Sequence, residues 1–167
     1  MPRFLPNSRT FYAIVFTVCA ALIAFGLYLQ HSKGLEPCPL CILQRVIFVA
    51  IGVVALVAAL FGTRRPAARI GVGLAVALLA LAGAGVAARQ SWLQHFPPPI
   101  QECGADFYFL VDTTPLSKLL PALFSGTGDC AKRGWLFLNL SIAEWALVCF
   151  AAIAILALWR TFFAQTR

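Results

Sequence analysis

The residues best suited to chemistry in this chain are its cysteines. Cys38 and Cys41 form a C-x-x-C pair, and Cys103 and Cys130 lie further along as a second, widely spaced pair. The C-x-x-C spacing holds two sulfurs close enough for a disulfide and is one at which thiols become reactive. Two such pairs can exchange with each other through mixed disulfides. The pattern therefore predicts electron transfer by thiol chemistry.

Three other uses of these cysteines compete with that prediction. Zinc sites share the C-x-x-C spacing, but Cys103 and Cys130 are spaced differently, so we expect no metal. A c-type haem attachment requires histidine after the second cysteine, where Ile42 stands. A purely structural disulfide in the loop of Cys103 and Cys130 remains open, and would contribute about 3–4 kcal/mol of stability.

Arg45 is the second residue with a chemical signal, because an arginine inside a membrane span is costly and usually functional. It follows Cys41 by four residues, about one turn later on the same helix face. Cys41 itself should lie at a helix N-terminus, where the dipole favours a thiolate. We expect Arg45 to stabilise that thiolate and a reduced, negatively charged acceptor beside it. The alternative is an interfacial anchor that extends to the membrane surface.

The elements that position these residues are apolar runs long enough to cross a bilayer. The chain is 61% hydrophobic and only 11% charged. Because about 20 apolar residues span a membrane as a helix, we expect an all-α, four-helix membrane bundle forming a single domain over residues 1–167. Its spans should cover about 11–29, 42–62, 70–88 and 142–163. Cys19 and Cys149 fall inside spans and should be buried as small hydrophobic residues.

The orientation of the bundle follows from the distribution of charge. Residues 1–10, 63–69 and 160–167 contain arginines and no acid, whereas all six acidic residues lie in or beside the other two loops. The positive-inside rule therefore predicts cytoplasmic termini and outward-facing loops at about 30–41 and 89–141. Both cysteine pairs would face outward. The net charge of +7 is then a topology signal, and arginines scattered over three segments do not predict nucleic-acid binding.

The longer outward loop contains a short amphipathic segment. Its apolar residues follow helical spacing and comprise Leu116, Leu119, Leu120, Leu123 and Phe124. A short helix on the membrane surface and a loop packed on its own helix ends are equally consistent with this pattern.

Two segments resemble the bacterial disulfide bond formation protein B (DsbB) family. Residues 37–45, PCPLCILQR, match the family's C-x-x-C-x-x-x-R signature, and residues 128–135, GDCAKRGW, match the segment around its last essential cysteine. The resemblance covers nearly the whole chain. It implies an inner-membrane enzyme that reoxidises a periplasmic DsbA-type thiol oxidase and passes the electrons to a membrane quinone, either ubiquinone or menaquinone.

The resemblance also implies a role for each site residue. Cys103 would be attacked by the reduced partner, with Cys130 as its disulfide mate. Cys38 and Cys41 would form the quinone-proximal pair, with Cys41 facing the quinone ring and Arg45 holding the quinone.

One position departs from the family pattern. Some members have histidine where this chain has Gln90, and a glutamine can hydrogen-bond a quinone carbonyl but cannot carry its proton. Gln90 is therefore a possible quinone ligand only.

The rival functions predict different behaviour. A non-enzymatic membrane subunit with loops stapled by disulfides would have no thiol-oxidising activity to lose. A transporter would require polar groups at mid-membrane, and the first and third spans offer none. An enzyme similar to vitamin K epoxide reductase uses related chemistry, but the segment around Cys130 matches it less well.

Overall fold

All four apolar runs fold as helices long enough to cross a membrane. The computed structural model describes residues 7–34, 37–63, 66–97, 130 and 136–163. Its long helices are α1 (Ser8–Lys33), α2 (Pro39–Phe61), α3 (Pro66–His95) and α7 (Ile142–Phe163). The prediction of an all-α, four-helix membrane protein is confirmed. Cys103 and the amphipathic segment at 114–124 lie outside the described residues.

Two helices extend well beyond the apolar runs that predicted them. α1 continues to Lys33 and ends at Gly34, whose φ of 63° is a left-handed cap that glycine adopts readily. α3 continues to His95, because no glycine or proline interrupts residues 86–96. Polar residues at the C-terminal end of a span can therefore remain helical. As a result Gln90, expected at the start of a loop, lies inside α3.

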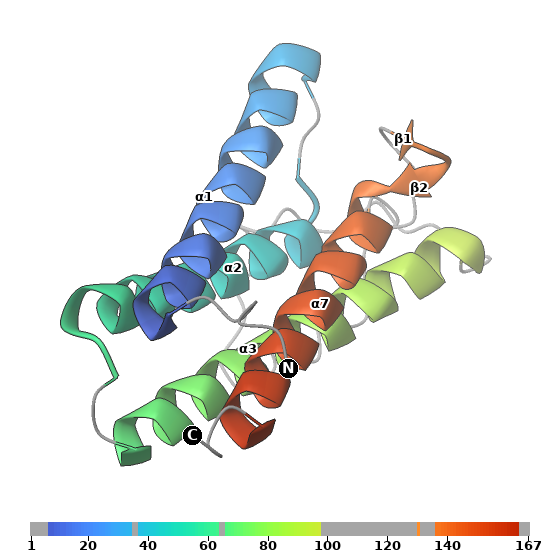
Figure 1. Cartoon of the computed structure of the whole chain (residues 1–167). Coiled ribbons are helices and arrows are strands. Elements are labelled where there is room, and N and C mark those ends of the chain that lie inside the picture. Colours follow the sequence, from blue (N-terminus) through green and yellow to red (C-terminus); the bar gives the residue numbers. More distant parts are fainter. Residues whose placement is uncertain (1–6, 35–36, 64–65, 98–129, 131–135, 164–167) are drawn as a thin grey trace, which may run out of the picture.

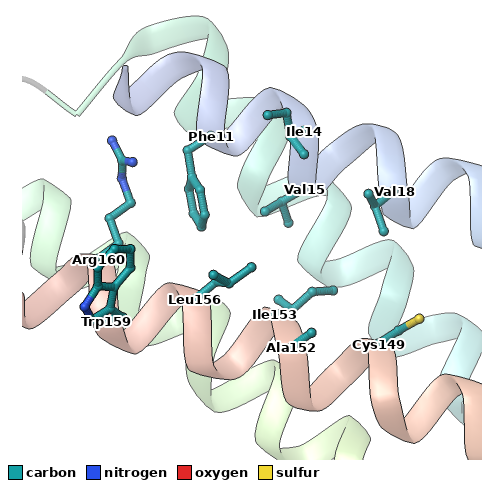
Figure 2. Close-up of a pocket in the computed structure, with 10 residues that line it drawn as sticks. All are labelled: Phe11, Ile14, Val15, Val18, Cys149, Ala152, Ile153, Leu156, Trp159 and Arg160. Atoms are coloured by element: carbon teal, nitrogen blue, oxygen red, sulfur yellow. The ribbon is translucent and has the colours of Figure 1, made fainter. Parts of the chain in front are cut away.

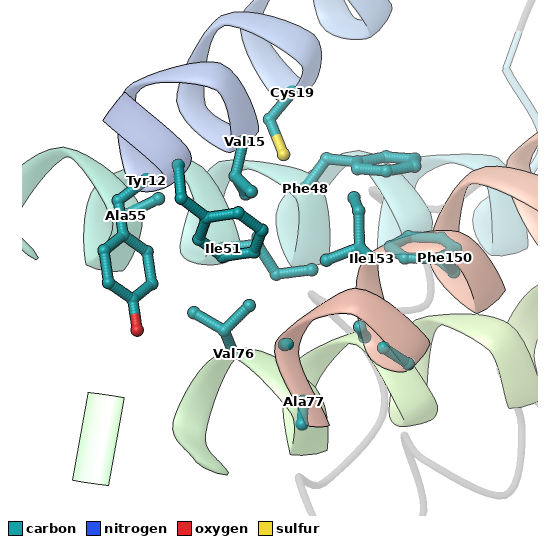
Figure 3. Packing of buried hydrophobic residues seen from close by; sticks show 14 of the residues in the cluster. Tyr12, Val15, Cys19, Phe48, Ile51, Ala55, Val76, Ala77, Phe150 and Ile153 are labelled. Atoms are coloured by element: carbon teal, nitrogen blue, oxygen red, sulfur yellow. The ribbon is translucent and has the colours of Figure 1, made fainter. Parts of the chain in front are cut away.

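The helices pack in a chain of neighbours, as Figure 1 shows: α1 lies against α2, α2 against α3, and α3 against α7. At the centre, the rings of Phe48 and Phe150 stack with centroids 3.9 Å apart. Ile51 and Val76 are fully buried beside them (Figure 3). This core fixes α2 relative to α3 and α7, and so fixes the N-terminal end of α2.

A groove of about 440 Å³ separates α1 from α7 and is lined almost entirely by apolar side chains (Figure 2). Phe11 and Val18 border it on α1, and Cys149 and Arg160 on α7. The guanidinium of Arg160 lies 4.8 Å from the centre of the Phe11 ring. This groove involves the first half of α1, whereas the C-x-x-C pair follows the end of α1.

A small hairpin leads into α7. Strands β1 (Leu136–Phe137) and β2 (Leu140–Ser141) pair antiparallel. They are joined by Leu138 and Asn139, which both have positive φ, as a two-residue hairpin turn of type I′ requires.

The start of α7 is tied to both the hairpin and α3. The backbone N–H of Ser141 donates to the Glu144 carboxylate at 2.6 Å, and the Glu144 N–H donates to the Ser141 hydroxyl at 3.3 Å. This reciprocal capping box also places Glu144 3.6 Å from His95 at the end of α3.

Candidate active site

The C-x-x-C pair lies at the beginning of α2, as the sequence predicted. Cys38 is the N-cap residue with extended backbone, and Pro39 occupies the first helical turn, where its missing N–H is not needed. The Ile42 N–H donates to the Cys38 carbonyl at 3.1 Å, which closes the first turn. That turn brings the sulfurs together: the Cys38 thiol donates to the Cys41 sulfur at 3.2 Å. Cys41 is partly exposed, whereas Cys38 is buried.

Cys130 joins this pair from a distant part of the chain. It is fully buried and packs with Cys38, Leu40, Val86 and Leu93. Its thiol hydrogen-bonds with Cys38 and is close enough to Cys41 to interact electrostatically. The sequence placed Cys130 in the outer loop as the mate of Cys103, and that pairing lies outside the described residues. The described structure brings Cys130 to the C-x-x-C pair.

The surroundings of Cys38 keep it protonated. Its hydrogen bond with Cys130, then that with Cys41, and then burial all raise the pKa of Cys38 above its ordinary value. A thiol of this kind is a poor nucleophile but a good hydrogen-bond donor. Cys38 and Cys41 are therefore chemically unequal, although both belong to one short motif.

Two glutamines form a buried amide pair behind the sulfurs. Gln90 of α3 is 3% exposed, and its side-chain N–H groups donate to Cys41 at 3.0 Å and to Cys38 at 3.4 Å. Gln44 of α2 is 5% exposed and donates to the Gln90 side-chain oxygen at 2.7 Å. The sequence predicted Gln90 as a possible quinone ligand. Its described hydrogen bonds are to the sulfurs and to Gln44.

Arg45 reaches across to α1. Its guanidinium donates to the Gln30 side-chain oxygen at 2.7 Å and to the Gly26 carbonyl at 3.2 Å. The expected position one turn beyond Cys41 is present, but both described hydrogen bonds of Arg45 go to the neighbouring helix. These bonds use two of its five N–H donors.

Sequence reasoning missed two of the residues that complete this site. Gln30 holds Arg45, and Gln44 holds Gln90. The available signal for Gln44 was its position beside Arg45 in a span whose other residues are apolar, since a polar side chain there is costly. Gln30 stands at the end of the first apolar run and carries no comparable signal.

The two remaining described cysteines lie elsewhere. Cys19 is 1% exposed within the helical core, as expected for a buried small residue. Cys149 is only partly buried, because it borders the groove between α1 and α7 (Figure 2). Both are free thiols.

The arrangement can carry out thiol–disulfide exchange. The sulfurs of Cys38, Cys41 and Cys130 lie close together. Cys41 is partly exposed and accepts a hydrogen bond from the Gln90 amide. Exchange requires a thiolate, an accessible sulfur and a leaving sulfur, and the site supplies candidates for each.

Comparison with known proteins agrees with this chemistry. A family model described as "Disulfide bond formation protein DsbB" matches residues 8–160. The chain is 51% identical to the disulfide bond formation protein B of Azoarcus sp. (strain BH72), over 100% of this chain and 98% of that protein. It is also 51% identical to the protein of that name from Aromatoleum aromaticum, over 95% of each. The protein of the same name from Methylococcus capsulatus is 44% identical over 92% of this chain and 94% of its own length.

Proposed function

The chain belongs to the disulfide bond formation protein DsbB family, and we propose that it reoxidises a periplasmic DsbA-type dithiol protein and transfers the electrons to a membrane quinone. The observation that supports this most directly is the cluster of Cys38, Cys41 and Cys130 at the outer end of α2. The proposal places the protein in the bacterial inner membrane, with both termini in the cytoplasm and this cluster on the periplasmic side.

The proposed reaction begins at the outer loop. A thiolate of the reduced partner attacks Cys103 in a disulfide of this chain, and the sulfur released from that disulfide leaves as a thiolate. The second thiol of the partner then displaces Cys103, which completes the partner's disulfide. Two electrons and two protons have left the partner. The contact between Cys130 and Cys38 supplies the path by which they reach the C-x-x-C pair.

The residues around Cys41 suit a quinone acceptor. A bound quinone would supply the two-electron acceptor and driving force that a protein disulfide lacks against a strongly oxidising partner. Cys41 is partly exposed at the beginning of a membrane helix, where a lipid-soluble molecule can approach it. Arg45 lies one turn away with N–H donors beyond the two used on α1, and those donors can hold a carbonyl oxygen. Comparing the rates with a ubiquinone analogue and a menaquinone analogue identifies which of the two is the acceptor.

The test is quinone reduction by the purified protein. Reduced DsbA-type partner and a soluble ubiquinone or menaquinone analogue are added to oxidised, detergent-solubilised protein, and the ultraviolet absorbance of the quinone is followed. We expect rapid reduction by the wild type. Cys41→Ser should lower the rate by more than about a hundredfold, because the variant lacks the reacting sulfur.

The matched control is Cys149→Ser, since Cys149 lies in α7 away from the cluster. It should retain the wild-type rate. If folded, oxidised wild-type protein reduces neither quinone type, the proposal is wrong. A membrane subunit with structural disulfides would then be the better description.

A further inference from the structure

The sulfur of Cys41 is the point at which two hydrogen-bond donors converge. The Cys38 thiol donates to it at 3.2 Å, and the Gln90 amide donates to it at 3.0 Å. The distance from Gln90 to the Cys38 sulfur is longer, at 3.4 Å. Hydrogen bonds to the charged form of a group favour that form. The geometry therefore favours negative charge on Cys41 and a proton on Cys38.

The benefit depends on which end of the Gln90 amide faces the sulfurs. A carboxamide has a donor end and an acceptor end that are nearly the same shape, and it can be rotated by half a turn. With the oxygen facing Cys41, the amide dipole would oppose a thiolate. If nothing were bound to the Gln90 oxygen and both thiols were neutral, neither orientation of the amide would be strongly preferred.

Gln44 favours one of these two orientations of Gln90. Its side-chain N–H donates to the Gln90 oxygen at 2.7 Å, and both side chains are almost fully buried. Because a rotated Gln90 would place two N–H groups against the Gln44 donor in a buried site, the rotated state loses a hydrogen bond and gains a clash of donors. With Gln44 oriented as in the structure, the observed orientation of Gln90 is therefore the favoured one.

We propose that Gln44 is a positioning residue, which acts through Gln90 to hold amide donors against Cys41 and so assigns the reactive thiolate to that sulfur. The importance of this assignment for electron transfer rests on the proposed function, but the effect on Cys41 requires neither quinone nor partner. Unlike a histidine, an amide does not titrate. The donors are therefore present at every pH at which the protein is folded.

The experiment measures the pH profile of Cys41 alkylation in reduced, quinone-free protein. Iodoacetamide reacts with thiolates, and mass-spectrometric fragmentation separates Cys41 from Cys38. Gln44→Leu and Gln90→Leu should each move the midpoint of Cys41 alkylation to higher pH by about one unit, the size of one charge-assisted hydrogen bond. Because Gln44 acts through Gln90, the double variant should match Gln90→Leu alone.

Gln94→Leu is the matched control. Gln94 lies on α3 one turn after Gln90, and the hydrogen bonds described for the two sulfurs do not include it. Its alkylation profile should equal that of the wild type. Helical circular dichroism on heating establishes that each variant is folded.

A second variant keeps the test decisive if Gln44→Leu fails to fold. Gln44→Met has nearly the same length and carries no charge, but its thioether cannot donate to the Gln90 oxygen, so it should also raise the midpoint. The proposal is overturned if folded Gln44 variants keep the wild-type profile. It is equally overturned if the shifts of Gln44→Leu and Gln90→Leu add in the double variant. Failure of quinone reduction alone would instead count against the proposed function.

Discussion

At the scale of single residues, the two cysteines of one C-x-x-C motif have opposite tasks. Cys38 donates a hydrogen bond, and Cys41 accepts hydrogen bonds from both Cys38 and Gln90. Cys38 is also the sulfur in contact with Cys130. Cys38, which precedes the helix, is therefore the sulfur placed to exchange with the distant cysteine, and Cys41, inside the helix, is suited to carry charge.

The contact with Cys130 predicts a pH effect on Cys38. Hydrogen bonding with Cys130 is the largest cause of the raised pKa of Cys38. A raised pKa keeps the thiol protonated to higher pH, so iodoacetamide should react with Cys38 more slowly than with an ordinary thiol near pH 8.5. Cys130→Ala removes the largest cause. The alkylation midpoint of Cys38 should then fall by about one pH unit or more.

This measurement uses the fully reduced protein, with Cys149→Ala as the comparison, because Cys149 lies in α7 and borders the separate groove. That variant should leave the profile of Cys38 unchanged. An unchanged profile in Cys130→Ala would mean that the two thiols do not meet in the reduced protein.

The sequence predicted those features of the site that are local. The C-x-x-C pair, its place at the start of a helix and Arg45 one turn later can all be read from residues 37–45. The pairing of Gln44 with Gln90 cannot, because the two residues are 46 positions apart and meet only when α2 packs on α3. The hydrogen bond from Arg45 to Gln30 depends in the same way on the packing of α1.

At the scale of elements, α3 packs closely on α7 at two glycines, Gly73 against Thr161 and Gly83 against Phe150. A Cβ atom added at Gly83 would lie 2.5–2.7 Å from three carbons of the Phe150 ring, and that ring stacks on Phe48 of α2. Small residues allow membrane helices to approach closely. The glycines of the third span therefore differ in importance, and the sequence alone did not distinguish them.

Gly83→Ala should destabilise the bundle, because the Phe150 ring would have to move and break its stack with Phe48. We expect a loss of about 1–3 kcal/mol in the free energy of unfolding, typical of an overpacked core. Gly85→Ala is the matched control on the same helix, since its added Cβ would have no neighbour within 4 Å among the described residues. Thermal or SDS-induced unfolding in detergent measures both. Equal effects of the two substitutions would contradict the packing described here.

The elements themselves were predictable to different degrees. Apolar runs predicted the four helices, but not their polar ends, since Ser91 and His95 continue α3 beyond the membrane-length run. The β1–β2 hairpin was not predicted. Its turn uses Leu138 and Asn139 at positive φ, and leucine is not a residue that signals such a turn. The Ser141-x-x-Glu144 capping box, which marks the start of α7, was not predicted either.

At the scale of the whole molecule, the proposed orientation has a direct test. In a variant with all six cysteines replaced by alanine, single cysteines are introduced at Ser32, near the end of α1, and at Ala67, near the start of α3. Both positions are exposed. The positive-inside rule places residue 32 outside and residue 67 in the cytoplasm.

A membrane-impermeant maleimide applied to spheroplasts should label Ser32→Cys at once. It should label Ala67→Cys only after the membrane is permeabilised. The reverse pattern would invert the bundle and place the C-x-x-C pair in the cytoplasm, where thiols are kept reduced. Thus the same labelling would test both the orientation and the compartment that the proposed reaction requires.

The cluster of Cys38, Cys41 and Cys130 contains an odd number of sulfurs, which limits how it can be oxidised. A disulfide uses two sulfurs, so any one disulfide formed within a group of three leaves one sulfur over. As long as these three stay together, oxidation within the group can never consume every thiol in it. Changing which two are joined changes only which sulfur is left. An odd number of sulfurs thus keeps one nucleophile in place at each internal step, without a thiol being supplied from outside.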